Sequence, residues 1–404
     1  MINLNKYEPF YNFGKTIRSR ELYKLLMTAI NSLFNELQNI KPLDLNISKY
    51  NRRYFLEKLA NLKSELVRDA YIVGSILCDS RTSLDDFVLI EYGGGIGLLS
   101  LLSKKLGIGN VLYNDIYDVS CEDAREIAQT LECEAEHYIQ GGIDELVRFC
   151  HRHKIKADGI VSYDVIEHIY NIDDFLRKLH LISHEGTAMM HASGANIFYY
   201  PYVKSVTKEQ KEIEAKGREK KLENKKRDSL LSYSQERKKI IKDYSPSLNE
   251  SEVARMVTNT RGLMRDDILK CVDQYINCKE FPKLIEHPTN TCDPYTGDWM
   301  EHLMNPYYLQ ETLSFNGFYA RVIPSYRTEG NNFIKNILIN IVNYIIRKSN
   351  TRYCLYFCSF YSIYTKYNGT FSDEIHIHHK YKYHRSPVRY ITKVLWDTLS
   401  PFLH

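Results

Sequence analysis

The chain has 404 residues, of which 44% are apolar and 26% are charged, with 54 Lys and Arg against 50 Asp and Glu. A chain of this length and composition can bury a sizeable core, which excludes a disordered chain, a collagen and a small disulfide scaffold. The formal net charge of +4 is nearly balanced for this size. No overall attraction to nucleic acid or membrane is therefore expected, and any such argument must be local.

Cysteine content and hydropathy indicate the compartment. The nine cysteines include no Cys-x-x-Cys pair, which favours free thiols in a reducing environment over a zinc ribbon. The first residues show no apolar core of a secretion signal, and polar residues interrupt the most apolar stretch, 333–346. We therefore expect a cytoplasmic protein without a transmembrane segment. A helix over 331–347 could contact a membrane surface peripherally, although packing on the sheet is its ordinary explanation.

Hydrophobic periodicity predicts helices first and then a sheet. Apolar residues at helical spacing over 16–38 and 50–78 predict a helical N-terminal segment, 1–80. From 81 to 198, short apolar runs alternate with helix-length segments, and this alternation predicts βαβ units around a parallel sheet. The expected strands contain 87–90, 111–113, 137–139, 159–161 and 187–190. The expected helices contain 97–106, 119–131, 142–153 and 171–181.

The alternation stops near residue 199 and resumes near 299. Residues 204–243 hold fourteen Lys and Arg against eight Asp and Glu, which predicts solvated helices in a basic insertion, 199–298. The segment 299–368 is expected to complete the sheet domain, and a basic, aromatic tail follows over 369–404. The expected elements of that segment are a helix at 306–316, a strand at 318–326, a helix at 331–347 and a strand at 353–366.

A glycine-rich loop follows the first expected strand, in the run Glu91-Tyr-Gly-Gly-Gly-Ile-Gly97. Glycines let the chain turn tightly and let a ligand approach main-chain N–H groups. A dinucleotide fingerprint would need Gly or Ala at position 98, where this chain has Leu98. With glycines at 93, 95 and 97 and an acid at 91, the loop resembles motif I of the class I S-adenosylmethionine-dependent methyltransferases. A purely structural glycine turn is the alternative.

This resemblance implies a Rossmann-like, doubly wound α/β fold with a seven-stranded sheet and S-adenosylmethionine as cofactor. The cofactor-binding residues would be Glu91, Gly93, Gly95, Gly97, Asp115, Gly142, Ile143 and Asp164. Asp115 ends the second expected strand, where a carboxylate can accept both ribose hydroxyls. Gly142 stands where the family usually has an acid near the adenine, so backbone groups of Gly142 and Ile143 are the expected contacts there.

A carboxylate–histidine cluster, Asp164-Val-Ile-Glu167-His168, follows the fourth expected strand. It resembles the D-x-x-E-H signature of a methyltransferase branch that includes the ubiquinone-biosynthesis O-methyltransferases. The small-RNA 2′-O-methyltransferases carry E-x-x-E-H there and bind a divalent metal, with one more histidine downstream. The resemblance implies that His168 and Glu167 act on the acceptor, beside Asp164. It also implies a possible Mg²⁺, Mn²⁺ or Zn²⁺ site made of Asp164, Glu167, His168 and His302, with His287 in reserve. The alternative is that Glu167 and His168 have a structural role and only orient the loop.

The expected function is therefore S-adenosylmethionine-dependent methylation, with the insertion acting as a lid over the acceptor. A hydroxyl of a glycan, lipid-linked or small-metabolite acceptor is preferred, because the relatives with this signature are mostly O-methyltransferases. A metal-dependent RNA ribose O-methyltransferase remains open, favoured by the basic stretch and tail but not by the balanced charge. A non-catalytic scaffold on the same fold is a further alternative. A nicotinamide-dependent enzyme is disfavoured by Leu98.

Overall fold

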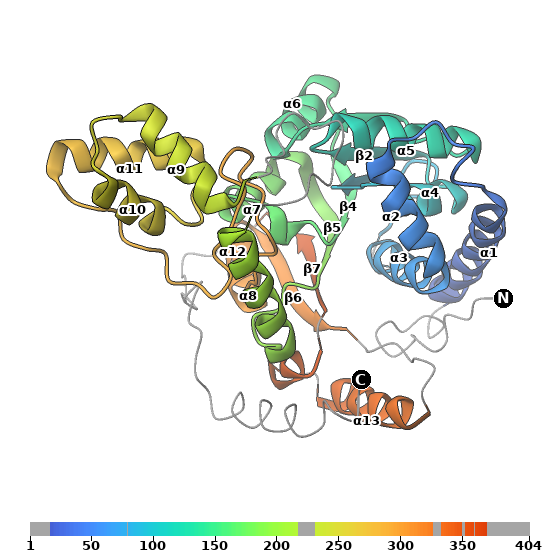
Figure 1. The fold of residues 1–404 in the computed structure, drawn as a ribbon. Coiled ribbons are helices and arrows are strands. Elements are labelled where there is room, and N and C mark those ends of the chain that lie inside the picture. Colours follow the sequence, from blue (N-terminus) through green and yellow to red (C-terminus); the bar gives the residue numbers. More distant parts are fainter. Residues whose placement is uncertain are drawn as a thin grey trace.

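The computed structural model describes residues 17–78, 80–216, 231–325, 333–349, 352–358 and 360–369. Its centre is a seven-stranded sheet in the order β3-β2-β1-β4-β5-β7-β6 (Figure 1). The strands are β1 (Val88–Tyr92), β2 (Asn110–Asp115), β3 (His137–Gln140), β4 (Ala157–Tyr163), β5 (Ser183–Ser193), β6 (Phe318–Pro324) and β7 (Tyr361–Tyr367).

The pairing of the strands makes the sheet doubly wound. The five strands β1 to β5 pair in parallel, and β7 runs antiparallel to both β5 and β6. The chain builds outward from β1 through β2 to β3, and then returns to place β4 on the other side of β1. The prediction of a Rossmann-like, seven-stranded α/β fold is confirmed. A sheet with this order has its switch point between β1 and β4, where such folds bind ligands at the carboxyl ends of the strands.

Two hydrophobic cores cover the two faces of the sheet because successive strand residues point to opposite sides. Leu89 and Val161 belong to the first core, and Ile90 and Ile160 to the second. The first core is completed by α1 (Ile17–Asn39), α3 (Leu62–Cys78), α4 (Leu98–Lys105) and α5 (Asp118–Thr130). The second is completed by α6 (Ile143–His153), α7 (Ile172–Lys178), α8 (Tyr200–Ala215) and α12 (Pro306–Phe315).

The N-terminal segment is helical as expected, but the predicted helix over 50–78 is two helices. A first helix, α2 (Lys49–Ala60), ends at Asn61, whose backbone N–H donates to the carbonyls of Lys58 and Leu59. Asparagine is a poor helix former, and α3 begins at the next residue, Leu62. The buried Asn51 of α2 donates to the Asp123 carboxylate of α5 at 2.8 Å, which holds α2 beside the edge of the sheet domain.

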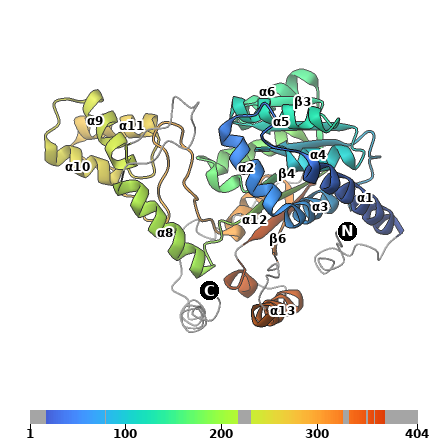
Figure 2. The same cartoon turned by 45° about the vertical axis from the view of Figure 1, so that its right-hand side comes forward.

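The insertion forms a lobe with a core of its own. After α8 it contains α9 (Tyr233–Tyr244), α10 (Glu250–Asn259) and α11 (Arg265–Cys278), which stand apart from the sheet at the left of Figures 1 and 2. Their shared core comprises Ile240, Ile241, Val253, Met256, Ile268, Val272 and Tyr275. In Figure 2, α8 is the long connection between this lobe and the sheet domain. The expected helices are therefore present, with part of the basic stretch, 217–230, outside the described residues.

The C-terminal part differs from expectation at one element. The predicted strand over 353–366 starts later than expected. Its first residues form a short 3-10 helix, η4 (Arg352–Tyr356), and β7 begins only at Tyr361. The helix α13 (Phe333–Ser349) packs against η4 and contributes Ile346 to the second core. The predicted tail lies outside the described residues from 370 onward. Among the helices that the structure describes, none combines the length and the apolar character needed to cross a bilayer.

We predict that the lobe depends on one buried ion pair. Arg237 of α9 is 2% exposed, and its Nη2 lies 2.6 Å from Oε2 of Glu214 at the end of α8. A Glu214→Gln variant leaves the guanidinium buried without an anion, and should lower the free energy of unfolding of the lobe by about 3–5 kcal/mol. Hydrogen exchange of the α9–α11 amides measures this directly. The control Glu250→Gln breaks an exposed pair with Lys242 and should cost less than about 1 kcal/mol; equal effects of the two variants would contradict the prediction.

Candidate active site

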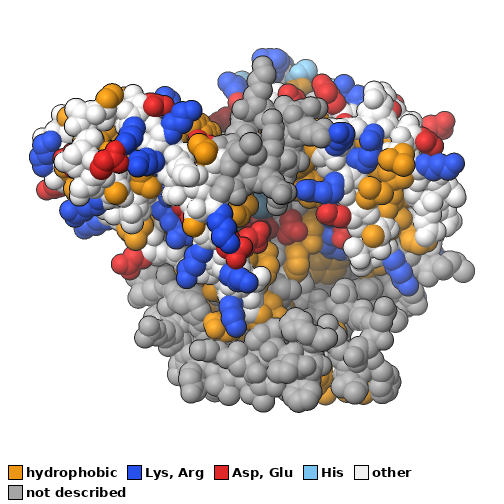
Figure 3. All heavy atoms as spheres, viewed as in Figure 1, with side chains coloured by type: hydrophobic (Ala, Val, Ile, Leu, Met, Phe, Trp, Pro, Cys, Tyr) orange, Lys and Arg blue, Asp and Glu red, His pale blue; other side chains and the backbone are white. Residues whose placement is uncertain are grey.

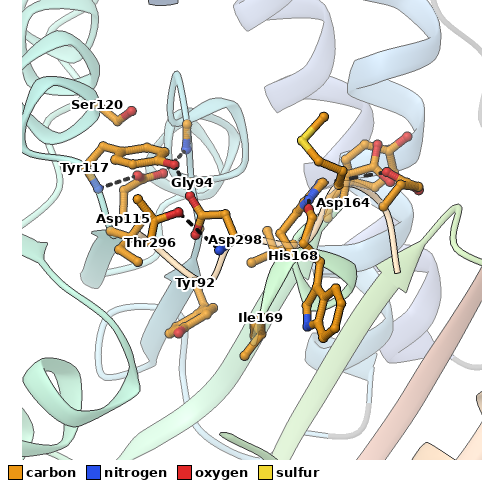
Figure 4. Close-up of a pocket in the computed structure, with 18 of the residues that line it drawn as sticks. Tyr92, Gly94, Asp115, Tyr117, Ser120, Asp164, His168, Ile169, Thr296 and Asp298 are labelled. Atoms are coloured by element: carbon orange, nitrogen blue, oxygen red, sulfur yellow. Dashed lines mark hydrogen bonds and ion pairs between the residues drawn. The ribbon is translucent and has the colours of Figure 1, made fainter. Parts of the chain in front are cut away.

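One cavity of about 1180 Å³ opens at the carboxyl ends of β1, β2 and β4. Its walls come from the glycine loop after β1, from α2 on one side and from α8 on the other. The segment 293–301, where the insertion returns to the sheet domain, closes over it. Figure 4 shows two groups of side chains in this cavity, one around Asp115 and Asp298 and the other around Asp164 and His168. The fold thus brings residues from four parts of the chain to the switch point.

The glycine loop adopts a conformation that only glycine accepts readily. Gly93, Gly95 and Gly97 have φ angles of +70°, +56° and +76°, in the left-handed region. A Cβ on Gly94 would overlap the ring of Tyr113, so the loop lies directly against the side chain of β2. A Cβ on Gly95 would meet no atom within 4 Å. The main chain at Gly95 is therefore the part of the loop that a ligand can approach.

Glu91 connects β1 to the first turn of α4. Its carboxylate accepts the backbone N–H of Ser100 at 2.9 Å and also the Ser100 hydroxyl. Burial raises the pKa of Glu91 from its ordinary 4.5 to about 8, while the Ser100 donors act in the opposite direction. Glu91 also lines the cavity. Its carboxyl group thus stabilises the loop geometry from behind.

Asp115 ends β2 beside the glycine loop, as predicted. Its Oδ2 accepts the backbone N–H of Gly95 at 2.9 Å, and its Oδ1 accepts the N–H of Tyr117 at 2.9 Å. These two donors fix the plane of the carboxylate at the cavity wall. Each oxygen can accept further hydrogen bonds, so Asp115 is oriented to receive hydroxyl groups of a ligand.

Gly142 and Ile143 line the cavity at the start of α6. The backbone N–H of Gly142 donates to Oε2 of Glu145 at 3.0 Å and is thus engaged by the cap of its own helix. The nearby Asp144 forms an ion pair with Lys178 at 2.6 Å. At this part of the site, a ligand would therefore interact mainly through packing against the cavity wall and through the positive end of the α6 dipole.

The turn after β4 carries the carboxylate–histidine cluster. Asp164 has a φ of +52°, and its N–H donates to the carbonyl of Ala192 at 3.0 Å. Glu167 follows in the 3-10 helix η2 (Ile166–His168) and is 0% exposed, yet neither of its carboxylate oxygens has a hydrogen-bond partner among the described residues. Burial, together with the neighbouring Asp164 and Glu301 carboxylates, raises the pKa of Glu167 well above its ordinary value. Such a group favours a bound proton or cation.

His168 is held in one tautomer by the returning insertion. Its Nδ1 lies 2.8 Å from the carbonyl oxygen of Trp299, and because a carbonyl only accepts, Nδ1 carries the proton. In the neutral ring, Nε2 is then a proton acceptor. This atom lies 3.9 Å from Oε2 of Glu301, and the side chain is 45% exposed to the cavity. His168 is therefore oriented as a base.

Glu301 is a site residue that the sequence analysis missed. Its Oε1 accepts the hydroxyl of Tyr202 from α8 at 2.7 Å, and burial raises its pKa above the ordinary value. One ligand atom each of Glu167, His168 and Glu301 lies within 4.8 Å of the others, a grouping that suits a metal ion. The sequence contains one signal for Glu301: this acid stands directly before His302, the residue predicted as a metal ligand. A φ of +62°, visible only in the structure, marks Glu301 as strained.

His302 and Asp164 are not part of this group of ligand atoms. The His302 ring is buried in an aromatic stack, 4.3 Å from the ring centroid of His287 and 4.4 Å from that of Trp299. Its Nδ1 lies 2.9 Å from the carbonyl oxygen of Thr289. The structure thus places both downstream histidines in the packing of the returning segment, and brings the neighbouring Glu301 to the position predicted for His302.

The returning segment also reaches the end of the cavity at Asp115. Asp298 accepts a hydrogen bond from the hydroxyl of Tyr117, two residues after Asp115. Trp299 donates from its ring N–H to the carbonyl of Tyr170 at 3.2 Å. Tyr117 and Asp298 were not predicted, because nothing in the sequence indicates that residues 181 positions apart meet. The turn at 293–299 therefore lies across the cavity beside Asp115 (Figure 4).

Comparisons with known proteins find only distant structural likenesses. No family model and no curated protein matches the chain. Similar solved structures include PKMT2 from Rickettsia typhi, with 12% identity, a TM-score of 0.35 and coverage of 73% of this chain and 52% of that one. An S-adenosylmethionine-dependent methyltransferase from Clostridium acetobutylicum shows 13% identity, a TM-score of 0.28 and coverage of 35% and 58%.

A third similar structure is a putative sarcosine dimethylglycine methyltransferase from Galdieria sulphuraria, with 14% identity, a TM-score of 0.27 and coverage of 32% and 46%. The chain thus spans about half the length of these three structures. Likenesses of this strength concern the fold alone and assign neither an activity nor an acceptor to this chain.

The raised pKa of Glu91 predicts how stability changes with pH. The folded state keeps the proton up to about pH 8, whereas the unfolded state loses it above its ordinary value of 4.5. Stability from this group is thus complete below pH 4.5 and is lost as pH rises toward 8, by about 1.4 kcal/mol per pH unit. Relative to wild type, Glu91→Gln should flatten this fall in urea unfolding curves between pH 5 and 8. The exposed control Glu122→Gln should keep the wild-type slope, and a wild-type slope in Glu91→Gln would refute the assignment.

Proposed function

We propose that this chain is an S-adenosylmethionine-dependent methyltransferase. The observation that carries the proposal is that a single cavity joins the glycine loop and Asp115 to the group of Glu167, His168 and Glu301. The first set of residues suits a nucleoside cofactor, and the second suits an acceptor that must lose a proton. Leu98 is a core residue at the start of α4, which speaks against a dinucleotide in the same loop.

The cofactor end of the cavity has the groups that S-adenosylmethionine requires. The open space beside Gly95 would take the methionine part, the oriented carboxylate of Asp115 would accept the ribose hydroxyls, and Asp164 would lie near the sulfonium. When bound, this cofactor supplies a methyl group on a positively charged sulfur. Transfer from it is an in-line displacement, so the residues act chiefly by positioning the two reactants.

The acceptor end supplies a base. His168 presents the unprotonated Nε2 toward the cavity and would take the proton of the acceptor. Tyr202 holds Glu301 beside it through the 2.7 Å hydrogen bond, so the carboxylate can stabilise the imidazolium that forms. The acceptor that the sequence resemblance implies is a hydroxyl of a glycan, a lipid-linked molecule or a small metabolite. A hydroxyl is a weak nucleophile at neutral pH, so it requires such a base or a metal.

A divalent cation, in a changed ligand set, is the alternative to the base, because the one free lone pair of His168, on Nε2, cannot both hold an ion and accept a proton. The buried oxygens of Glu167 without donors, and the oxygen and nitrogen atoms grouped within 4.8 Å, suit Mg²⁺, Mn²⁺ or Zn²⁺. Glu167, His168 and Glu301 would hold the ion, in place of the predicted set with Asp164 and His302. A bound cation there would lower the pKa of a coordinated acceptor hydroxyl.

Calorimetric titration with S-adenosylhomocysteine tests the function. It is run with EDTA and again with Mg²⁺, Mn²⁺ or Zn²⁺, and metal binding is followed separately by titrating the ion alone. Micromolar binding of S-adenosylhomocysteine, the demethylated product of the cofactor, is expected. An absence of binding under every condition would reject the enzyme and leave a scaffold on this fold.

A Gly95→Arg variant should abolish binding of S-adenosylhomocysteine while the protein stays folded. The new side chain starts in open space at the cavity, and the left-handed φ of +56° costs only about 1–3 kcal/mol. Gly107→Arg is the matched control, because Gly107 has a φ of +91° and open space but lies at the other end of α4. Binding to Gly95→Arg with the affinity of the control would show that the loop is not the cofactor site.

A His168→Ala variant should keep the affinity for S-adenosylhomocysteine and lower turnover by about 10²–10⁴, the range for loss of a general base. Turnover is measured as S-adenosylhomocysteine released from the cofactor with a panel of hydroxyl and amine acceptors. His151→Ala, on the exposed side of α6, should be unchanged. A His168→Ala rate equal to that of this control would remove His168 from the chemistry.

A further inference from the structure

The charges that line the cavity are strongly unbalanced. Among the described residues around it, twelve are Asp or Glu and four are Lys or Arg. Glu91 keeps its proton up to about pH 8, and Asp144, Glu145 and Asp174 pair with Lys178 or Arg148 from outside the lining. The acids that remain still outnumber the four bases, so the lining is negative. The whole chain, by contrast, is slightly positive. Acidic side chains also gather in the hollow at the centre of the face in Figure 3, between the lobe and the N-terminal helices. The cavity therefore attracts cations, although the protein as a whole does not.

Most of the basic side chains in the lining form ion pairs with neighbouring acids. Lys58 lies 2.5 Å from Glu65, and Arg68 lies 2.7 Å from the buried Asp69. Arg53 lies 3.8 Å from Glu57 on the same helix. These pairs do not offer a ready phosphate site to a ligand, so a polyanionic acceptor would meet mainly negative charge in this cavity.

Four acids of the lining form what we call the acidic rim: Asp164, Glu209, Glu212 and Glu301. Asp164 lies in the group of Figure 4 that is separate from Asp115, and Asp164 and Glu209 both act electrostatically on Glu301. Glu209 and Glu212 project from α8, and neither forms an ion pair with any residue that the structure describes. Glu209 lies close enough to Glu301 to help raise the pKa of that carboxyl. The rim thus concentrates negative charge next to His168, where the acceptor would react.

A separate observation points to a missing positive partner. Glu167 is completely buried behind the rim, and both of its oxygens lack a hydrogen-bond partner among the described residues. One of these oxygens lies within 4.8 Å of ligand atoms of Glu301 and His168, so it faces the rim. A buried carboxylate without donors is costly unless a positive charge or a proton accompanies it.

We infer that the methyl acceptor is a cationic molecule whose alkylammonium group binds at the acidic rim, beside His168. This inference rests on the proposed function, which it deepens by naming the class of acceptor. An alkylammonium has three donors for carboxylate oxygens and a stem that can pack on the aromatic wall, which includes Tyr202 and Phe360. A phosphate-rich acceptor such as RNA is disfavoured by the same charges.

Three five-carbon probes of equal length test the inference. 5-Aminopentan-1-ol, pentane-1,5-diol and glutarate are each titrated calorimetrically into the full chain with EDTA, in the presence and absence of S-adenosylhomocysteine. The amino alcohol should bind at least about tenfold more tightly than the diol, glutarate should not bind, and the amine affinity should fall with added salt. A diol that binds as well as the amino alcohol, or tighter binding of glutarate or of a short RNA, would overturn the inference.

Charge-removing variants locate the amine. The double variant Glu209→Gln/Glu212→Gln should weaken binding of 5-aminopentan-1-ol by about tenfold or more, while binding of pentane-1,5-diol and S-adenosylhomocysteine stays unchanged. Glu122→Gln removes an exposed acid outside the cavity and is the control. An unchanged amine affinity in the double variant would overturn the assignment to the rim.

The two proposals fail in different ways. Binding of S-adenosylhomocysteine without preference for the amine would reject the cationic acceptor and keep the methyltransferase. Binding of the amine without binding of S-adenosylhomocysteine would reject the methyltransferase and keep an alkylammonium site at the rim.

Discussion

The architecture of the candidate site depends on how the returning insertion is bonded to the turn after β4. The N–H groups of Trp299 and His302 donate to the carbonyls of His168 and Glu167, and His168 donates in return to the carbonyl of Trp299. These reciprocal bonds satisfy polar groups of the η2 turn that would otherwise be left open. They also select the tautomer of His168 and place Glu301 beside it. Without these bonds, neither the tautomer of His168 nor the position of Glu301 would be fixed.

Backbone strain is concentrated at the same junction. Five described residues other than glycine have a positive φ, and three of them, Glu132, Lys154 and Lys279, directly follow helices, where this conformation is common. The remaining two are Asp164 and Glu301, which lie in the site. Strained residues persist where the surrounding structure over-determines them, often at functional sites. Here the pairing of the two segments supplies that constraint, and the strain turns both carboxylates toward the cavity end that contains His168.

The negative lining extends from the end of the cavity around Asp115, proposed for the cofactor, to the end around His168, proposed for the acceptor. Under the proposed function, an acidic cavity in a low-dielectric wall would favour the positive sulfonium of S-adenosylmethionine over the neutral sulfide that remains after transfer. Glu91 and Glu167 illustrate what this arrangement requires, because both are buried carboxyl groups with raised pKa values. Glu91 is compensated by Ser100, whereas Glu167 has no such donor in the described structure. The acid that is left uncompensated is the one next to His168.

The sequence by itself determined the local elements and the end of the cavity around Asp115. The periodicities predicted the strands of the sheet domain, and the spacing of Gly93, Gly95 and Gly97 with Asp115 predicted a loop and a carboxylate that the structure brings within 2.9 Å. These features are local or follow from strand order, since carboxyl ends of neighbouring parallel strands meet at one edge. Tertiary structure alone decided the end of the cavity around His168, because Glu301, Tyr202 and the acids of α8 reach the cavity through an insertion of about 100 residues whose path leaves no periodic signal. His302 was chosen by residue type, but packing buries it in an aromatic stack and turns its neighbour Glu301 toward His168.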